Sequence, residues 1–237
     1  KKKFNFKILE DACHAFGSSY NYKDKKNMIG SCKHSDICTF SFHPVKTITT
    51  GEGGAITTNN YELYKKISYL RSHGIVRSRK RPWEYNINSL SLNLRLSDIN
   101  CALGISQLRK IKIFLKKRSL LAIKYYEMLK NIKNLDLLKN SDSLNSANHL
   151  FIIYINFKKI RKTKDSFFNY MKKNNIQCQY HYIPIYKFNN ISKTKQKNKF
   201  KNSEIYFRNA VSIPIFYNLN FRTQKIITKK IIKFITN

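Results

Sequence analysis

The sequence predicts an α/β domain followed by a smaller α+β domain. In the first half, short apolar runs end in residues that can do chemistry, and glycine-rich turns separate them. After the polar segment 140–148 the pattern changes to strand, helix, strand and a closing helix. With 237 residues, of which 42% are hydrophobic, the chain is long enough to bury a core in one or two domains.

The first domain is predicted to contain three short strands, at residues 6–9, 39–42 and 55–58. A turn rich in glycine joins the last two, at Gly51, Gly53 and Gly54. A helix is predicted at 61–73 and is expected to end at Gly74. The first run has no room before it for the helix and strand that normally build a parallel sheet, so this domain is expected to begin part-way through.

Two helices are predicted to connect the domains. Ser97 followed by Asp98 is typical of a helix N-terminus, apolar residues continue at helical spacing, and a second helix follows at 118–130. The second domain is predicted to contain strands at 149–157 and 177–182 and helices at 164–174 and 223–235. We therefore expect a large domain at 1–118, a linking helix and connector at 119–144, and a small C-terminal domain at 145–237.

The net charge of +33 would by itself suggest a polyanion as partner. The lysines are spread along the whole chain, however, together with many Asn, Ile, Tyr and Phe residues, all of which have A/T-rich codons. Nucleotide bias explains the composition without a binding patch, so we expect no nucleic-acid partner. A basic nucleic-acid-binding module remains the alternative that the charge alone would support.

Cysteine usage and hydropathy narrow the class of protein. The five cysteines are scattered, which argues against a disulfide framework and suits a reducing compartment. Cys32, His34 and Cys38 lack a second ligand pair at zinc-finger spacing, so no metal site is expected. No apolar run reaches the roughly 18 residues of a membrane-spanning helix, and no signal peptide is evident. We expect a cytoplasmic protein without a membrane partner.

Two motifs place chemical groups at the ends of predicted strands. The first is EDACH at 10–14 and the second is FSFHPVK at 40–46. Pyridoxal phosphate needs a lysine for covalent attachment and an acid that keeps its pyridine nitrogen protonated, which Lys46 and Asp11 could supply. Ser41 could bind the cofactor phosphate, and His14 could lie against the ring. On spacing alone, a surface lysine and a turn-forming aspartate remain an open alternative.

Longer strings around these motifs resemble the sugar aminotransferases of the DegT type. They are EDACHAFG at 10–17, FSFHPVKTITTGEGGA at 40–55, LRSHGI at 70–75, NLRLSDI at 93–99, HYIPI at 181–185 and SIP at 212–214. The resemblance covers nearly the whole chain. It implies fold type I of the pyridoxal-phosphate-dependent transferases, with a large domain of mainly parallel sheet and a small α+β domain. It also implies that the large domain is N-terminally incomplete in this chain.

The resemblance assigns roles to individual residues. It implies that Lys46 binds pyridoxal 5'-phosphate covalently, that Asp11 contacts the pyridine nitrogen, and that Ser41 contacts the phosphate. The resemblance also implies that Asn93 reaches the phosphate of the neighbouring subunit's cofactor. The protein is therefore expected to be a homodimer with shared active sites. Four further residues are implied to line the pocket. They are His14 beside the cofactor and His43, His181 and Tyr182 toward the substrate.

Within that family, the strings at 43–54 and 181–185 most resemble the transaminases of pseudaminic acid synthesis. The implied substrates are a UDP-linked 4-keto-6-deoxy-N-acetylhexosamine and an amino-acid donor, normally glutamate. Relatives that act as dehydratases have histidine in place of the lysine, so Lys46 favours amino transfer. A catalytically inactive remnant of such an enzyme is the alternative that the absent N-terminal segment leaves open.

Overall fold

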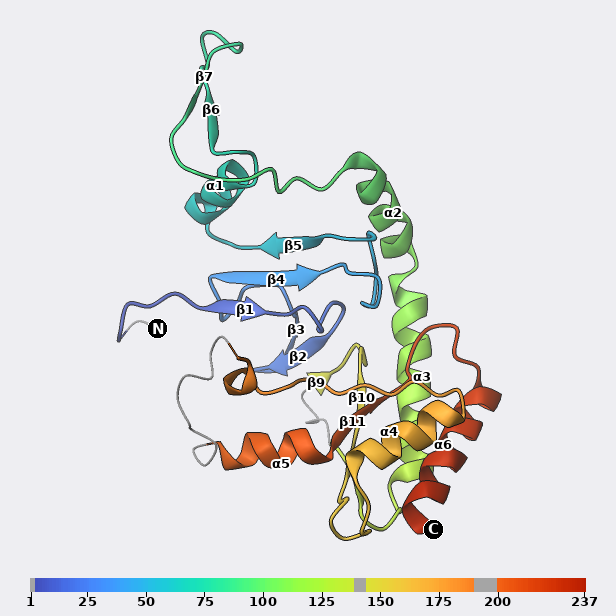
Figure 1. Cartoon of the computed structure of the whole chain (residues 1–237). Coiled ribbons are helices and arrows are strands. Elements are labelled where there is room, and N and C mark those ends of the chain that lie inside the picture. The colour runs from blue at the N-terminus through green and yellow to red at the C-terminus, as the bar shows by residue number, and fades with distance from the viewer. Residues whose placement is uncertain (1–2, 139–143, 190–199) are drawn as a thin grey trace. The chain divides into compact units, whose positions relative to one another are not determined.

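The structure is a computed structural model that describes residues 3–138, 144–189 and 200–237 (Figure 1). The chain divides into two compact units, the first made of residues 1–114 and 142–147 and the second of residues 115–141 and 148–237. The domain boundaries expected from the sequence, at 118 and 144, stay a prediction.

The first unit is built on a three-stranded sheet with the order β1-β4-β5. The strands are β1 (Leu9–Asp11), β4 (Ile37–Ser41) and β5 (Gly54–Thr57). β1 runs parallel to β4, whereas β4 and β5 are antiparallel. The sequence predicted a mainly parallel sheet. Of the two pairings among these described strands, one is parallel and one is antiparallel. The first strand begins three residues later than the predicted run at 6–9.

The core of this sheet is small and aromatic. Cys38 and Phe40 of β4 are buried together with Ala12 and Cys32. Phe16 packs edge-on against the ring of Phe40, with ring centroids 5.2 Å apart. Because alternate residues of β4 are buried, its polar residues Thr39 and Ser41 point to the other face.

A second sheet in the same unit was not predicted. It has the order β3-β2-β9, with β2 (Ser19–Tyr22), β3 (Lys25–Met28) and β9 (Leu144–Asn145). Lys23 and Asp24 join β2 to β3 with φ of +48° and +56°, as a two-residue hairpin turn of the I′ type requires. Little in the sequence predicts this sheet, because β3 reads KKNM and lacks alternation of apolar and polar residues.

The helices of the first unit begin close to where the sequence places them. α1 (Tyr61–Leu70) is capped by the side chain of Asn60, and α2 (Asp98–Arg109) is capped by Ser97 as expected. α1 ends earlier than predicted, since residues 71–74 form a turn with Gly74 at φ +66°. Between the helices lies an unpredicted hairpin of β6 (Ile75–Arg77) and β7 (Tyr85–Ile87).

α3 (Ile111–Leu129) begins seven residues before the predicted helix at 118–130 and leads into the second unit. There an antiparallel sheet has the order β11-β10-β8, with β8 (Leu135–Leu137), β10 (Phe151–Ile155) and β11 (Ala210–Ile213). Its helices are α4 (Lys164–Lys173), α5 (Lys201–Asn209) and α6 (Phe221–Thr236), with a short 3₁₀ turn η1 (Ile185–Lys187). Within the described residues, four α-helices and three strands thus make up this α+β unit.

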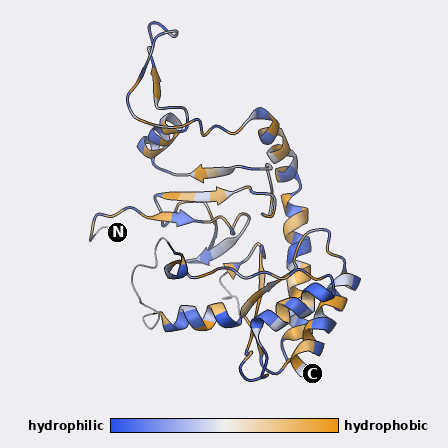
Figure 2. Cartoon of the chain, in the orientation of Figure 1, coloured by the Kyte–Doolittle hydropathy of each residue, from blue (hydrophilic) through white to orange (hydrophobic). Residues whose placement is uncertain are grey.

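The core of the second unit is larger than that of the first. It draws buried side chains from α3, β10, α4 and α6, among them Leu121, Tyr125, Leu129, Ile153, Ile155, Phe167, Met171, Ile231 and Phe234. Figure 2 shows hydrophobic and hydrophilic residues alternating along α6. Ile227 and Ile231 are buried there, while Ile226 is half exposed, as a one-sided helix requires.

The prediction of a strand at 177–182 is wrong. Gln179 forms a single antiparallel bridge with Ser212, and the remaining residues form no strand. The partner of β10 is instead β11, which the sequence analysis recorded only as the motif at 212–214. Since β8 and β11 occupy both edges of β10, the segment 177–182 can only lie outside β11.

Arg118 of α3 is buried in the second unit and forms hydrogen bonds to backbone carbonyls. Its Nη1 donates to the carbonyl oxygens of Asn148, His149 and Ile215, at 3.1, 3.2 and 3.0 Å. Burial lowers the pKa of this guanidinium. It joins α3 to the start of β10 and the end of β11 and so fixes three segments that are distant in sequence.

Lys164, at the start of α4, is enclosed by aromatic rings. Its Nζ lies 4.8 Å from the ring centre of Phe207 and 5.0 Å from that of Tyr180, and it donates to the carbonyl of Phe207 at 2.6 Å. Burial lowers the pKa of this amine to about 8, against a smaller opposite effect of Asp165. The folded chain therefore releases this proton at lower pH than the unfolded chain does.

This difference predicts a pH dependence of stability. Between pH of about 8 and about 10.5 the unfolded state binds more protons at Lys164, so the free energy of unfolding contributed by this residue rises with pH. We expect the wild-type chain to gain stability relative to Lys164→Met across that window, in urea unfolding at several pH values. A difference between the two proteins that stays flat or falls with pH would contradict the assignment.

None of the described helices is long and apolar enough to cross a membrane.

Candidate active site

The candidate site lies where β1 and β4 end. The two strands are parallel, with Asp11 opposite Thr39, so their carboxyl ends meet at the same edge of the sheet. The pairing continues one residue further, because the N–H of Ala12 donates to the carbonyl of Thr39 at 2.9 Å. Asp11 and Ser41, the last residues of their strands, are thereby placed at neighbouring positions.

The carboxylate of Asp11 is oriented by the turn that follows it. Its Oδ1 accepts the backbone N–H of Cys13 at 3.0 Å. Hydrogen bonds from the thiol and then the N–H of Cys13, with smaller contributions from the charges of His14 and Lys46, lower the pKa of Asp11. The hydrogen bond between the Cys13 thiol and Asp11 in turn raises the pKa of that thiol. Asp11 is therefore ionised at neutral pH and lies within electrostatic reach of Lys46.

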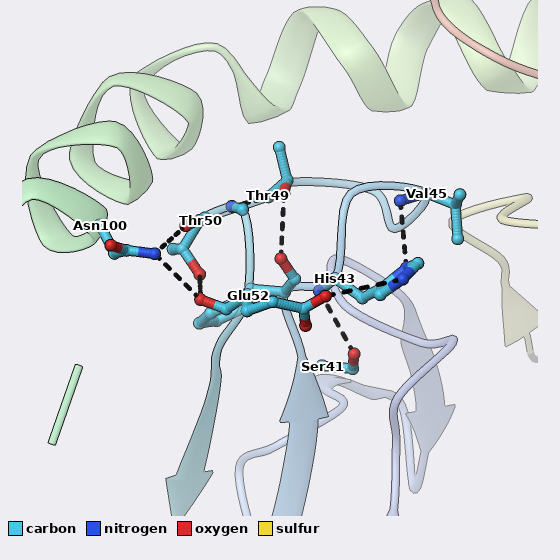
Figure 3. Close-up of polar contacts among 9 residues, drawn as sticks. Ser41, His43, Val45, Thr49, Thr50, Glu52 and Asn100 are labelled. Atoms are coloured by element: carbon cyan, nitrogen blue, oxygen red, sulfur yellow. Dashed lines mark hydrogen bonds and ion pairs between the residues drawn. The ribbon is translucent and has the colours of Figure 1, made fainter. Parts of the chain in front are cut away.

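The loop between β4 and β5 carries Lys46 and is closed by hydrogen bonds of its backbone and of the Thr49 side chain, the latter drawn in Figure 3. The carbonyl of Phe42 accepts the N–H of Thr50 at 3.0 Å and the hydroxyl of Thr49 at 3.0 Å. The N–H of Phe42 in turn donates to the carbonyl of Gly53 at 2.8 Å. Both ends of the loop are therefore tied to one residue, which limits its motion.

Lys46 is half-buried within this loop. Its N–H donates to the carbonyl of His43 at 2.9 Å, and the next two residues, Thr47 and Ile48, are buried. The backbone at Lys46 is therefore held from both sides, and the amine extends from a fixed support.

Ser41 and His43 are linked by a local hydrogen bond. The hydroxyl oxygen of Ser41 accepts the N–H of His43 at 3.4 Å, and the Nδ1 of His43 accepts the N–H of Val45 at 3.4 Å. The Nε2 of His43 lies 3.9 Å from a carboxylate oxygen of Glu52, a pair that is ionic only when the imidazole is protonated. His43 is exposed, and Figure 3 shows it turned toward Glu52. A role in substrate binding stays a prediction.

Asn100 ties α2 to the same loop, and the sequence analysis did not single it out. Its side-chain amide donates to the carbonyl of Thr50 at 2.5 Å and to that of Glu52 at 3.3 Å. The available signal was its place in the first turn of a helix that Ser97 caps. That position indicates a capped helix but gives no information on a contact 50 residues away.

Gly54 stands where β5 passes closest to β4. A Cβ at this position would lie 2.4 Å from the backbone carbonyl oxygen of Phe40, a contact that requires the strands to separate. We expect Gly54→Ala to lower the free energy of unfolding by about 1–3 kcal/mol, in the range of other overpacking substitutions. Urea unfolding measures this.

The matched control is Gly51→Asn in the same loop. At φ +81° asparagine adds backbone strain at Gly51 but no close contact, since the nearest atom to its Cβ is Asn100 Nδ2 at an ordinary 3.6 Å. Equal losses in the two variants would show that the close approach at Gly54 has no particular cost.

The contacts of Asn93 are with residues other than those at the ends of β1 and β4. It forms an isolated bridge with Ser72, and its side-chain oxygen accepts the N–H of Arg95 at 3.3 Å. Among the described residues, neither partner belongs to the strand ends of β1 and β4. The predicted contact with a neighbouring subunit's cofactor stays a prediction.

His181 and Tyr182 belong to the second unit, whereas Asp11, His14, Ser41 and Lys46 belong to the first. The Nδ1 of His181 lies 2.7 Å from the hydroxyl oxygen of Ser212, and the peptide bond between His181 and Tyr182 is cis. The two rings meet edge-on with centroids 4.7 Å apart. Their predicted contact with substrate stays a prediction.

The strand-end residues suit a cofactor with an aldehyde, a phosphate and a basic ring nitrogen. The ionised Asp11 can accept a hydrogen bond from a protonated pyridine nitrogen. The hydroxyl of Ser41 can donate to a phosphate oxygen, and the amine of Lys46 can react with an aldehyde. Asp11 and Ser41 end adjacent strands of the first unit, and Lys46 lies in the loop that follows the second of these strands.

Comparison with known proteins matches residues 1–232 to the model of the DegT/DnrJ/EryC1/StrS aminotransferase family. UDP-4-amino-4,6-dideoxy-N-acetyl-beta-L-altrosamine transaminase of Campylobacter jejuni is 38% identical over 226 residues, which are 95% of this chain and 58% of the relative. The protein of the same name in Helicobacter pylori is 33% identical over 98% of this chain and 60% of the relative. The chain thus spans less than two thirds of the length of these relatives.

Solved structures give the same picture. Helicobacter pylori PseC, an aminotransferase involved in the biosynthesis of pseudoaminic acid, matches with a TM-score of 0.87 and 32% identity over 98% of this chain and 60% of that chain. The sugar aminotransferase Spr1654 of Streptococcus pneumoniae in its PLP form matches with a TM-score of 0.84 and 25% identity, over all of this chain and 61% of that chain. These likenesses confirm the predicted fold class, that of the fold type I pyridoxal-phosphate-dependent transferases.

Proposed function

Since the chain belongs to the DegT/DnrJ/EryC1/StrS aminotransferase family, we propose that it is the cofactor-binding part of a pyridoxal-phosphate-dependent sugar aminotransferase. The observation that carries the proposal is that Asp11 ends β1 while Lys46 lies in the loop after the neighbouring parallel strand β4, with the charge of Lys46 acting on Asp11. The proposed substrate is a UDP-linked 4-keto-6-deoxy-N-acetylhexosamine, with glutamate as amino donor. The names of the Campylobacter and Helicobacter relatives support this choice.

Each residue has a proposed task that its surroundings allow. Pyridoxal phosphate, when bound, supplies the electron sink for the reaction. Asp11 accepts a hydrogen bond from the ring nitrogen and keeps it protonated, and Ser41 donates to the phosphate. Lys46 would hold the cofactor covalently through its side-chain amine, and that amine would supply the base for proton transfer. His14 packs on the cofactor side of the pocket.

We propose His43, His181 and Tyr182 as the residues that contact the sugar. The test is an assay with the UDP-linked 4-keto sugar, glutamate and pyridoxal phosphate, followed by mass spectrometry of the sugar nucleotide. Transfer gives a product in which an amino group replaces the keto oxygen. An unchanged sugar with a purified protein that binds the cofactor would reject this substrate.

We also propose a homodimer that brings Asn93 to the partner's cofactor phosphate. The support is that the segment carrying Asn93 exposes three large apolar side chains, those of Leu90, Leu92 and Leu94. We expect sedimentation to give a dimer and the double replacement Leu92→Ser, Leu94→Ser to give a monomer. Ile226→Ser, on the exposed side of α6, is the control that should leave the dimer intact. A wild-type monomer would contradict the proposal.

An inactive protein is the second candidate. The observation that favours it is the exposure of apolar side chains along the sheet of the first unit, including Leu9 of β1 and Ile56 of β5. It predicts binding of a hydrophobic dye, a broad melting transition and no effect of pyridoxal phosphate on either. A sharp transition that shifts upward with the cofactor would reject it.

A further inference from the structure

The segment that carries the predicted substrate-binding histidine is held to the second unit by the three residues ahead of it. Cys178 is buried, and Gln179 exchanges two backbone hydrogen bonds with Ser212, at 3.0 and 2.7 Å. The ring of Tyr180 packs edge-on against that of Phe207, with centroids 5.8 Å apart. The backbone is therefore fixed by contacts that do not involve the imidazole.

Ser212 is itself fixed by the sheet. It lies in β11, opposite Ile152 of β10 on one side and Gln179 on the other, and is 6% exposed. Among the described residues, the hydrogen-bond partner of its hydroxyl is the Nδ1 of His181 at 2.7 Å. Either atom could donate across this distance, depending on the tautomer of the imidazole. Donation by the hydroxyl gives the proton of this buried serine an acceptor among the described residues.

We propose that Ser212 is a positioning residue that donates its hydroxyl proton to Nδ1 of His181 and so keeps the imidazole proton on Nε2 and the ring in one orientation. A neutral imidazole carries its proton on one nitrogen, and the bond made by the other nitrogen selects which. The consequence for chemistry rests on the proposed function. If His181 lines the sugar-nucleotide pocket, its Nε2–H is a donor suited to a substrate oxygen.

Nitrogen NMR of the histidine side chains of the whole chain tests this without substrate or cofactor. The spectrum is recorded in mildly alkaline buffer, where a neutral ring reports its tautomer, and His181→Gln identifies the signals of His181 among those of the six histidines. We expect wild-type His181 to show the Nε2–H form alone. Ser212→Ala should give a mixture of both tautomers, and Ser212→Thr, which keeps the hydroxyl, should restore the single form.

Ser203→Ala is the matched control, since Ser203 is exposed on α5. It should leave the His181 signals unchanged, and all three serine variants should keep the pattern of backbone amide signals of the wild type outside β11. A wild-type proton on Nδ1, or a Ser212→Ala spectrum identical to the wild type, would overturn the proposal. Because the readout needs neither cofactor nor sugar, its outcome is independent of whether the proposed amino transfer is observed.

Discussion

Lys46→Ala is expected to remove both the covalent attachment of pyridoxal phosphate and measurable amino transfer. In the proposed mechanism Lys46 supplies the amine that binds the cofactor and the base that moves the proton, and loss of positioned proton transfer alone slows such reactions by about 10²–10⁴-fold. The loop that carries Lys46 is closed by backbone bonds at Phe42, so the alanine variant should keep the wild-type fold. Absorbance after addition of the cofactor and the sugar assay measure the two losses.

Lys66→Ala provides the control for this variant. Lys66 is exposed on α1, within the same unit as Lys46, and should keep both the absorbance and the rate of wild type. Retention of the cofactor absorbance by Lys46→Ala would assign the covalent bond to another lysine and remove the basis of the proposed mechanism.

Phe167→Ala is expected to cause the largest loss of stability in the second unit. Phe167 of α4 has no exposed surface and packs edge-on against Phe234 of α6 with centroids 5.1 Å apart, and it also contacts Phe157. Truncation of a buried phenylalanine leaves a cavity that costs about 3–5 kcal/mol. A loss of this size exceeds the effect expected of any surface change and is measured by urea unfolding followed by circular dichroism.

Phe216→Ala is the matched comparison, because Phe216 is 46% exposed in the same unit. Its loss should be well below that of Phe167→Ala. Similar losses for the two variants would contradict the assignment of the core to the contact between α4 and α6.

The elements that the sequence predicted are those with a local signal. Ser97 and Asp98 indicate the start of α2, because the cap forms within four residues of the chain. The closing helix was predicted from its isoleucine stripe, of which Ile227, Ile231 and Ile235 are buried whereas Ile226 is half exposed. β2, β3 and β11 were missed, since KKNM has no period and the AVSI of β11 is buried at every position and does not alternate. Pairing partners, rather than local preference, make these segments strands.

The site divides in the same way. Asp11 and Lys46 could be proposed as site residues because each stands in a contiguous string at or just after a strand end, and parallel strands bring such ends together. The bond from Asn100 to Thr50 spans 50 residues, and the bond between His181 and Ser212 spans 31. A single sequence holds no signal for contacts of that separation, so these supporting residues required the structure.

The central claim is that Lys46 is the lysine that binds the cofactor, and reductive trapping tests it most directly. The chain is incubated with pyridoxal phosphate and reduced with borohydride, and the modified lysine is located by peptide mass spectrometry. Lys164 is the internal competitor, because burial lowers the pKa of its amine to about 8 and makes it the more reactive of the remaining described lysines. We predict the reduced adduct on Lys46 in excess over Lys164 at low cofactor concentration. An adduct on Lys164 or spread over surface lysines, with Lys46 unmodified, would contradict the account.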